Sequence, residues 1–289
     1  MKKAISTLLI LTIAAAMLSA CSGGNAGFDY EKAIEVVTRE DGSGTRTAFI
    51  ELFGIEQRNA DGTRQDLTTK EAVIARQTDV MMTNIAGNQY SVGYISLGSL
   101  NETVKAVQIE GVAPTAENVK NGTYPISRPF NIAVKDKPSE LAQDFIDFIM
   151  SAEGQAVVAQ SYIAAKENAP AYSGKKPSGK IVIAGSSSVT PVMEKLKEAY
   201  IALNPNASVE IQMSDSSAGI TAVTEGSCDI GMASRDLKDS EAAQLTSIQI
   251  ALDGIALIVN KDNPASSLTI EQVKAIFTGE AKTWSIAGK

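Results

Sequence analysis

The clearest pattern along the chain lies between Glu35 and Phe53, where a short apolar run, a polar turn and an apolar stripe follow one another. Val36 and Val37 are typical of a buried strand, and Gly42-Ser43-Gly44 favours a tight turn. Apolar residues then follow at the spacing of a helix face: Phe49, Ile50, Leu52 and Phe53. The stretch therefore predicts a strand, a turn and a helix in that order.

The same order recurs twice in the second half of the chain. The expected strands are 181–184 and 209–212, the turns are 185–188 and 214–219, and the helices are 189–203 and 220–225. Pro191 suits the first turn of the earlier helix, because proline is tolerated where its missing N–H is not needed. Residues 229–235 are typical of a strand that runs into a polar loop.

The rest of the chain predicts further elements. We expect helices at 68–76, 116–120 and 139–160, strands at 81–83, 92–97 and 104–109, and an extended segment at 124–134. In the longest helix Ser139 suits the N-cap, and Leu141, Phe145 and Phe148 repeat at helical spacing. Residues 164–179, which contain glycine, proline, serine and lysine, are the one linker-like stretch.

The first residues carry targeting signals. Two lysines precede an apolar run at 8–16, and the tetrad 18–21 (Leu-Ser-Ala-Cys) resembles the lipobox of bacterial lipoproteins. The run is too short to cross a bilayer as a helix. We expect residues 1–20 to be a signal peptide, Cys21 to carry the lipid and 21–27 to be a tether. An uncleaved membrane anchor is the alternative.

The charge balance is acidic. The formal net charge is −7, and loss of the signal peptide leaves 24 Lys and Arg against 33 Asp and Glu, about −9. Such a balance argues against nucleic acid as a partner. It does not argue against a small anion, because the donors of a pocket outweigh a distant surface charge that salt screens.

No histidine occurs in the chain. Its absence excludes Ser-His-Asp and Cys-His nucleophilic sites and histidine-bound zinc, but it does not exclude an enzyme that works with carboxylates. If Cys21 is lipidated, Cys228 is the only remaining thiol, so we expect no intrachain disulfide and a small core residue at Cys228. We expect no metal and no cofactor.

The three Ser/Gly turns can bind an anion. The first N–H groups of a helix have no intrahelical partner, and the helix dipole favours negative charge beside them. Ser43 and Thr45 add hydroxyl donors, and Arg39 adds a guanidinium suited to tetrahedral oxyanions. A single turn of this kind is equally well explained by a serine that caps a helix. Three of them, each behind a strand, favour convergence on one anion.

Four segments match motifs of one known family. They read REDGSGT at 39–45, GSSSVTP at 185–191, SDSSAGI at 214–220 and DIGMASR at 229–235. The first segment resembles the central R-x-D-G-S-G-T motif of the phosphate-binding protein of bacterial phosphate ABC transporters. The other three resemble, in that order, the first loop, the second loop and a strand end of the same family. The first motif is the most specific, and the likeness covers nearly all of the chain after residue 30.

This resemblance implies an α/β fold with two lobes, of the periplasmic-binding-protein-like (type II) kind, with a hinge and a central ligand cleft. Carried over by matching position, the phosphate-binding residues are Arg39, Ser43, Gly44 and Thr45 in one lobe and Ser187, Ser188, Val189, Thr190, Ser216 and Ser234 in the other. In the loop 187–190 the donors are one hydroxyl and one or two amides, and the resemblance does not choose among them.

One departure from the family concerns the proton of phosphate. Some members place an aspartate directly after the serine that matches Ser234, where this chain has Arg235. A carboxylate in the site accepts that proton and repels sulfate. Asp41 is the remaining candidate acceptor and is also expected to hold Arg39 in place; a simple turn residue is the alternative role. Glu40 is expected to be solvated.

The order of the halves also departs from the family. The segment that resembles 180–289 comes first in the family, so this chain resembles a circular permutation in which the linker joins the old ends. The resemblance then predicts a split lobe of 28–124 plus 258–289 and a continuous lobe of 125–257, with crossings near 124–130 and 253–259. Wrongly joined fragments are the competing explanation.

The function that this resemblance implies is capture of inorganic phosphate by a monomeric lipoprotein on the extracytoplasmic face of the cell membrane. Its partners would be the permease and ATPase of an ABC importer, with contact to the membrane only through the lipid, and it would not be an enzyme. A binding protein for sulfate or molybdate, a phosphate sensor that docks on a membrane kinase, and a phosphatase are the alternatives.

Overall fold

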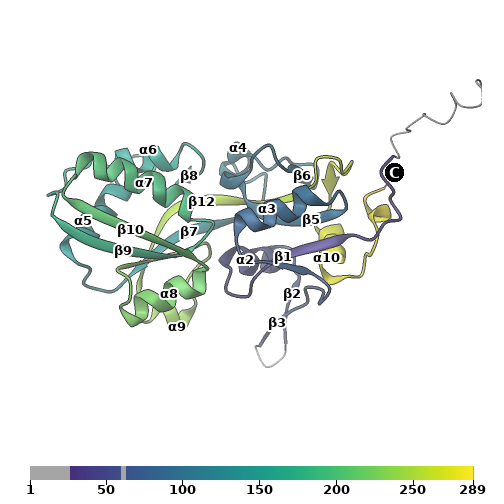
Figure 1. Cartoon of the computed structure of the whole chain (residues 1–289), viewed down its shortest axis with the longest axis horizontal. Coiled ribbons are helices and arrows are strands. Elements are labelled where there is room, and N and C mark those ends of the chain that lie inside the picture. The colour runs from purple at the N-terminus through teal and green to yellow at the C-terminus, as the bar shows by residue number, and fades with distance from the viewer. Residues whose placement is uncertain (1–26, 60–62, 289) are drawn as a thin grey trace, which may run out of the picture.

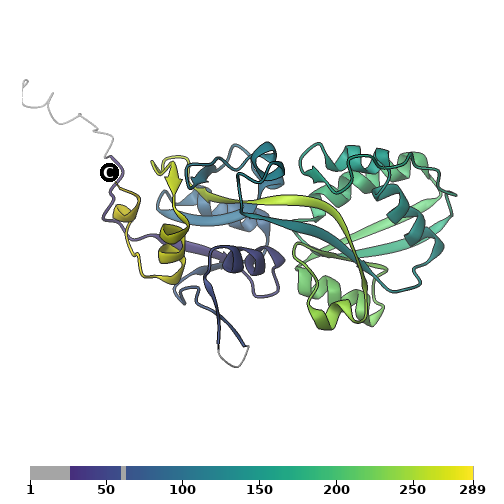
Figure 2. The ribbon, with the colours of Figure 1, turned by 180° about the vertical axis from the view of Figure 1, so that it is seen from behind.

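The computed structural model describes residues 27–59 and 63–288 of the chain. The expected signal peptide, the lipidation site Cys21 and nearly all of the tether therefore lie outside the described residues. The described chain forms two lobes that lie side by side and are joined by long strands (Figures 1 and 2). None of the described helices is long and apolar enough to span a membrane.

One lobe, here called the split lobe, is built from the beginning and the end of the described chain (Figure 1). Its strands are β1 (Glu35–Arg39), β2 (Glu56–Arg58), β3 (Arg64–Asp66), β4 (Val73–Ala75), β5 (Ser91–Ser96), β6 (Lys105–Ile109) and β13 (Ser267–Leu268). Its helices are α2 (Gly44–Leu52), α3 (Thr78–Gly87), η1 (Leu97–Ser99), α4 (Ala116–Lys120), α10 (Ile270–Thr278) and η2 (Trp284–Ala287). Thr269 and Gln272 form a capping box at the start of α10.

The other lobe, here called the continuous lobe, takes its residues from the middle of the chain. Its strands are β7 (Ser127–Val134), β8 (Ile163–Ala164), β9 (Gly179–Ser186), β10 (Ala207–Ser214), β11 (Ile230–Ala233) and β12 (Thr246–Val259). Its helices are α5 (Glu140–Ile149), α6 (Ala152–Val158), α7 (Thr190–Leu203), α8 (Ser216–Glu225) and α9 (Asp239–Ala242). Helix α8 ends at Gly226, whose φ of 82° is a left-handed conformation that glycine adopts without strain.

Both lobes use the same strand order. In the continuous lobe β10, β9 and β11 are parallel, β7 is antiparallel to β11, and β12 is antiparallel to β7. In the split lobe β4, β1 and β5 are parallel, β12 is antiparallel to β5, and β6 is antiparallel to β12. The loops after the parallel strands therefore share one edge of each sheet, which is where open α/β sheets bind ligands.

Separate hydrophobic cores stabilise the two lobes. In the continuous lobe Phe145, Phe148 and Tyr200 are buried among the helices on one face of the sheet. In the split lobe the rings of Phe49 and Tyr94 stack with centroids 3.8 Å apart. Each such side chain contributes about 2 kcal/mol through burial. The core of the split lobe also includes Ile126 and Ile255, two positions that the sequence assigned to the continuous lobe.

Strands β7 and β12 carry the chain between the lobes (Figures 1 and 2). They pair from Val134 and Thr246 in the continuous lobe to Ser127 and Gly254 at the crossing. We refer to the crossing as the hinge. It contains an ion pair between Arg128 and Asp253, in which each side chain is 1% exposed. A buried pair of this kind offsets a large desolvation cost only while both partners are present.

Three expectations about secondary structure are wrong. Residues 68–76 are not a helix, because they contain a turn and the edge strand β4. Residues 81–83 lie inside helix α3 and not in a strand; Met81 and Ile85 are four residues apart and both buried, as one helix face requires. The expected helix at 139–160 is two helices, because Ser151 caps a new one.

The linker-like stretch 164–179 packs against the continuous lobe. The carboxylate of the buried Asp144 accepts hydrogen bonds from the hydroxyls of Tyr172 and Tyr200 and from the N–H of Lys175. At the other side of the molecule the two ends of the described chain meet, since Ala33 forms an isolated bridge with Thr283. Ends that lie this close are what a circular permutation requires.

Candidate anion-binding site

Four helices begin at the interface between the lobes, α2 and α3 from the split lobe and α7 and α8 from the continuous lobe. Their first turns and the strand ends beside them bring seven hydroxyl side chains together. We call these the hydroxyl cluster: Thr45, Thr78, Ser186, Ser187, Ser188, Ser216 and Ser234. None of the seven is more than 6% exposed. The interface is therefore polar, and water has little access to it.

Arg39 brings the positive charge to this cluster from the end of β1. Its side chain is 3% exposed, and its Nη2 donates to Ser187 Oγ of the other lobe over 3.1 Å. Its Nε and Nη2 also donate to the two carboxylate oxygens of Glu40 over 2.8 and 2.7 Å. Glu40 thus holds one edge of the guanidinium fork and directs the other toward the hydroxyls. The expectation that Glu40 is solvated is wrong.

The lobes contact each other directly around Arg39. The Oγ1 of Thr45 lies 2.9 Å from the Oγ of Ser188, and the N–H of Ser217 donates to the carbonyl of Gly42 over 3.2 Å. At Gly44 a Cβ atom would lie only 2.5 Å from Ser216 Oγ. Only glycine permits this approach. The structure is therefore a closed arrangement of the two lobes.

Within the continuous lobe, three serines from different elements form one side of the cluster. Ser234 Oγ lies 3.0 Å from Ser186 Oγ and 3.4 Å from Ser216 Oγ. The N–H of Ser234 donates to Ser216 Oγ over 3.1 Å. Ser216 is the first residue of α8, whose N-cap is Asp215, so this helix begins four residues earlier than the sequence predicted.

Other residues expected to bind the anion use their side chains locally. Ser43 Oγ accepts from the N–H of Arg46 and so caps α2, and Thr190 Oγ1 donates to the carbonyl of Ser186. Val189 is fully buried in the core of the continuous lobe. The backbone N–H groups of Ser43 and Val189 are also engaged, since they donate to the carbonyls of Glu40 and Ser186.

The structure places Asp41 away from the cluster. Its side chain is 95% exposed, and its carboxylate pairs with Arg46 Nη1 at 2.7 Å. The expectation that Asp41 holds Arg39 is wrong, because Glu40 does so. Because its side chain is exposed and the cluster is buried, Asp41 also does not face an anion bound among the hydroxyls.

Arg235 is buried but does not contribute a free charge. Its Nη1 and Nη2 donate to the two carboxylate oxygens of Glu241 over 2.7 and 2.9 Å. Burial favours the protonated form of Glu241, but the hydrogen bonds from Arg235 and from the N–H of Lys238 outweigh it and lower the pKa of that carboxyl. Arg235 Nη2 lies 3.3 Å from Ser217 Oγ, so the pair supports the start of α8.

Sequence reasoning missed Thr78. The error at 68–83, where a helix and a strand were expected, hid the start of α3. Thr78 Oγ1 lies 3.4 and 3.5 Å from the Oγ atoms of Ser187 and Ser188 and 3.5 Å from Arg39 Nη1. The spacing of Met81 and Ile85 was the signal that could have revealed the helix.

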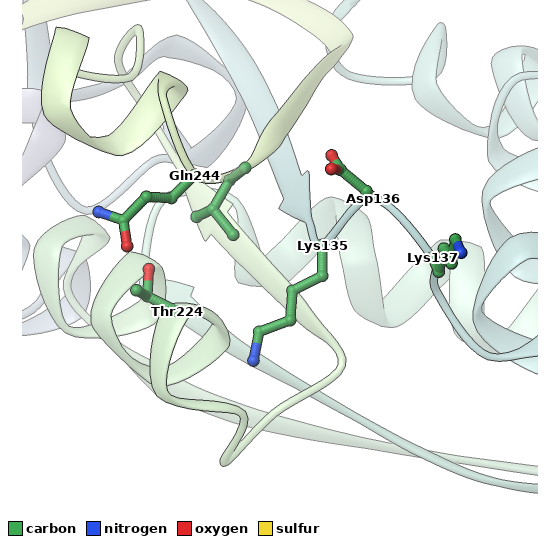
Figure 3. A pocket seen from close by; sticks show the side chains of 6 residues that line it. Lys135, Asp136, Lys137, Thr224 and Gln244 are labelled. Atoms are coloured by element: carbon green, nitrogen blue, oxygen red, sulfur yellow. The ribbon is translucent and has the colours of Figure 1, made fainter.

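A surface pocket of about 510 Å³ lies elsewhere, in the continuous lobe, and is lined by Lys135, Asp136, Lys137, Thr224, Gln244 and Leu245. In Figure 3 Lys137 lies well apart from Thr224 and Gln244, so these polar groups do not converge. We assign no function to this pocket. The described residues contain no group of three or more Cys, Asp or Glu side chains placed to hold a metal ion.

Two lobes of like topology that close on a polar interface are the architecture of the periplasmic-binding-protein-like fold. A family model described as a PBP superfamily domain matches residues 20–153 and 170–288, and the chain belongs to that superfamily. Within it, the chain belongs to the family of the phosphate-binding proteins. Phosphate-binding protein PstS 2 of Streptococcus agalactiae is 50% identical over 275 residues, which cover 94% of each chain.

Solved structures and shorter matches agree with this family. The crystal structure of a phosphate ABC transporter phosphate-binding protein from Streptococcus pneumoniae is 46% identical, with a TM-score of 0.70 over 88% of this chain and 98% of that one. Phosphate-binding protein PstS of Staphylococcus haemolyticus is 39% identical, but over only 35% of this chain and 34% of its own. Exchanged halves would produce such a partial match, and the permuted order is our proposal.

Proposed function

We propose that the protein binds inorganic phosphate between its lobes and delivers it to an ABC importer. The observation that carries this proposal is the meeting of Arg39 with the hydroxyl cluster at a buried interface, where segments far apart in the sequence supply donors to one place. The phosphate-binding proteins reported above, one of them 50% identical, support the choice of ligand.

Binding would follow closure of the lobes about the hinge. A tetrahedral oxyanion needs many donors once water is excluded, and serine and threonine hydroxyls, backbone N–H groups and one guanidinium provide them. Because the donors come from both lobes, an anion can satisfy all of them only in the closed arrangement. The proposed direct ligands are Arg39, Gly44, Thr45, Ser187, Ser188, Ser216 and Ser234, with the backbone N–H of Thr190 beside them. The N–H groups of Ser43 and Val189 donate to the carbonyls of Glu40 and Ser186 and are not included.

The proton of hydrogen phosphate would be accepted by a hydroxyl oxygen. Among the carboxylates near the cluster, Glu40 is engaged by Arg39 and Asp41 faces solvent. A serine or threonine oxygen both donates and accepts, so it tolerates either a protonated or a bare ligand oxygen. Such a site rejects sulfate less strongly than one with a fixed carboxylate, and sulfate is therefore the second candidate ligand.

We further propose that the protein is a monomeric lipoprotein, attached through Cys21 to the extracytoplasmic face of the cell membrane and partnered there by a permease and an ATPase. The lipobox-like tetrad at 18–21 is the support for the attachment. We propose no catalytic activity, because the described cluster pairs its hydroxyls with one another and with Arg39 and places no carboxylate or histidine beside them to act as a base.

Calorimetric titration of the purified protein with phosphate, arsenate and sulfate tests the proposed ligand. We expect micromolar or tighter binding of phosphate, similar binding of arsenate, and weaker but measurable binding of sulfate. Tight binding of sulfate without any response to phosphate would refute phosphate as the ligand. If none of the three anions gives a saturable binding isotherm, the anion site itself is refuted.

A further inference from the structure

The split lobe contains a counterpart of Ser216. In the continuous lobe β10 is the edge strand of the parallel set, and the helix that follows it, α8, begins with Ser216. In the split lobe β4 occupies the same place beside β1, and the helix that follows it, α3, begins with Thr78. The two lobes therefore present a hydroxyl residue at the same point of the same topology, one from each side of the interface.

Thr78 is placed among the groups that would surround an anion. It is 6% exposed, and its Oγ1 lies near Ser187 Oγ, Ser188 Oγ and Arg39 Nη1 at 3.4, 3.5 and 3.5 Å. These separations exceed the usual distance of about 2.7–2.8 Å between hydrogen-bonded hydroxyl oxygens. The Thr78 hydroxyl is thus close to three polar groups and makes no hydrogen bond of ideal length with any of them.

The start of α3 adds to this arrangement. Its N-cap residue, Gln77, makes no side-chain capping bond, whereas α2 is capped by Ser43 and α8 by Asp215. The helix is 10 residues long, so its dipole favours negative charge near Thr78. An anion held by the Thr78 hydroxyl would lie where this field is strongest.

We propose that Thr78 is a direct ligand of the bound anion, with its hydroxyl donating to an anion oxygen that Arg39 also contacts. This inference rests on the proposed function, because it assigns another ligand to the same site. A bridging role, in which Thr78 only steadies Arg39, is the alternative that the experiment must separate. The two roles differ in whether Thr78 contacts the bound anion, so that a substitution at Thr78 changes the surroundings of the anion itself.

The experiment compares three variants of the protein by calorimetric titration with phosphate. Thr78→Val keeps the shape and removes the hydroxyl, Thr78→Ser keeps the hydroxyl, and Thr83→Val makes the same change on the exposed side of the same helix. Because Thr78→Val removes a hydrogen bond to a charged partner, we expect it to bind phosphate about ten- to a hundred-fold more weakly. Thr78→Ser and Thr83→Val should stay within about threefold of the unsubstituted protein.

The ³¹P NMR signal of bound phosphate separates a ligand from a bridging residue. We expect the signal to move in Thr78→Ser, whose shorter side chain changes the contact, and to stay unchanged in Thr83→Val. Normal affinity in Thr78→Val, or an unchanged signal in Thr78→Ser at full occupancy, would overturn the proposal. If Thr78→Val does not fold, Thr78→Ser still provides the spectroscopic test.

Failure of the proposed function gives a different result. If the unsubstituted protein does not bind phosphate but binds sulfate, the ligand is wrong, and the same three variants titrated with sulfate still test Thr78. If the unsubstituted protein binds phosphate and Thr78→Val binds it equally well, only the inference about Thr78 fails.

Discussion

In each lobe three parallel strands end at the interface, and the residues at those ends can be compared pair by pair. The inner strands β1 and β9 lead into the starts of α2 and α7, and the edge strands β4 and β10 lead into Thr78 and Ser216. The third strands are β5, which ends at Ser96, and β11, which ends one residue before Ser234. The two halves of the site are thus built on one plan.

The charge is not shared between the halves. Arg39 of the split lobe and Arg235 of the continuous lobe are each paired with a glutamate, Glu40 and Glu241, but Arg39 also donates to Ser187 of the cluster. The split lobe therefore places a guanidinium at the cluster, and the continuous lobe contributes neutral hydroxyls to it. An anion attracted by Arg39 needs the second lobe to complete its hydrogen bonds, which ties binding to closure.

The third strand ends differ as well. Ser234 lies in the cluster, but Ser96 lies near the hinge, where its hydroxyl makes no hydrogen bond to the described residues. Near it, Arg128 Nη2 donates to Asp253 over 3.2 Å, while Arg128 Nε and Nη1 make no hydrogen bond to the described residues. Burial raises the pKa of Asp253 to about 6 although Arg128 opposes the shift. The buried arginine of the hinge thus serves the fold, and Arg39 is the arginine that we propose for the ligand.

Among the changes that test this comparison, removal of Arg39 should lower phosphate affinity the most. Two charge-assisted hydrogen bonds, each contributing about 1.5–3 kcal/mol, correspond to a loss of roughly 100- to 10,000-fold in phosphate affinity for Arg39→Ala. Ser216→Ala removes a neutral hydroxyl of the other lobe and should cost about tenfold. Calorimetry on both variants measures the ratio of the two losses, and equal losses would mean that the Arg39 guanidinium contributes no more to binding than one neutral hydroxyl.

A substitution that interferes with closure of the lobes should have an intermediate effect on phosphate affinity. In Gly44→Ala the added Cβ meets Ser216 Oγ at 2.5 Å and Ser234 Oγ at 2.8 Å, so the lobes must separate slightly. We expect phosphate affinity to fall about tenfold, with the free energy of unfolding without ligand changed by less than about 1 kcal/mol.

Gly87→Ala is the matched control for this substitution, because a Cβ at Gly87 meets nothing within 4 Å. Small-angle scattering with saturating phosphate should show a larger radius of gyration for Gly44→Ala than for Gly87→Ala. Identical radii and identical affinities would mean that the close approach at Gly44 is not needed for binding.

A change at Asp253 of the hinge should have the smallest effect. We expect this effect only as a change in how the free energy of unfolding depends on pH. Because the folded pKa of Asp253 is about 6 and the ordinary value is 3.8, the native state binds more protons than the unfolded chain between these values. This contribution is fully present below about pH 4 and is lost as the pH rises through about 6. Arg128 stays charged throughout this range.

Denaturant unfolding at pH 4.5 and pH 7 measures this effect without phosphate. The free energy of unfolding of the protein relative to Asp253→Asn should fall by about 1–2 kcal/mol between these pH values. The difference between the two proteins isolates Asp253, because the other carboxyls titrate alike in both. A difference that does not change with pH would show that Asp253 keeps its charge when buried.

Much of this protein follows from its sequence. Local hydrogen bonding and side-chain periodicity act over a few residues, so the first two strand–turn–helix units and the short helix α4 were predicted near their observed bounds. In the third unit the order of elements was right, but the helix begins four residues earlier than predicted. The motif at 39–45 also placed Arg39 and Thr45 correctly at the interface, and the convergence of Arg39 with Ser187 was expected from the resemblance.

Only the tertiary structure decided how neighbouring residues divide their roles. Glu40 and Asp41 are adjacent acids in one turn, but the former pairs with the buried Arg39, whereas the side chain of the latter is 95% exposed and pairs with Arg46. Thr78 was hidden because a three-residue edge strand carries too little periodicity to be recognised and gains its stability from pairing with β1. Sequence fixes what each segment can form locally, but contacts between distant segments depend on which surfaces are buried together, and that is a property of the whole fold.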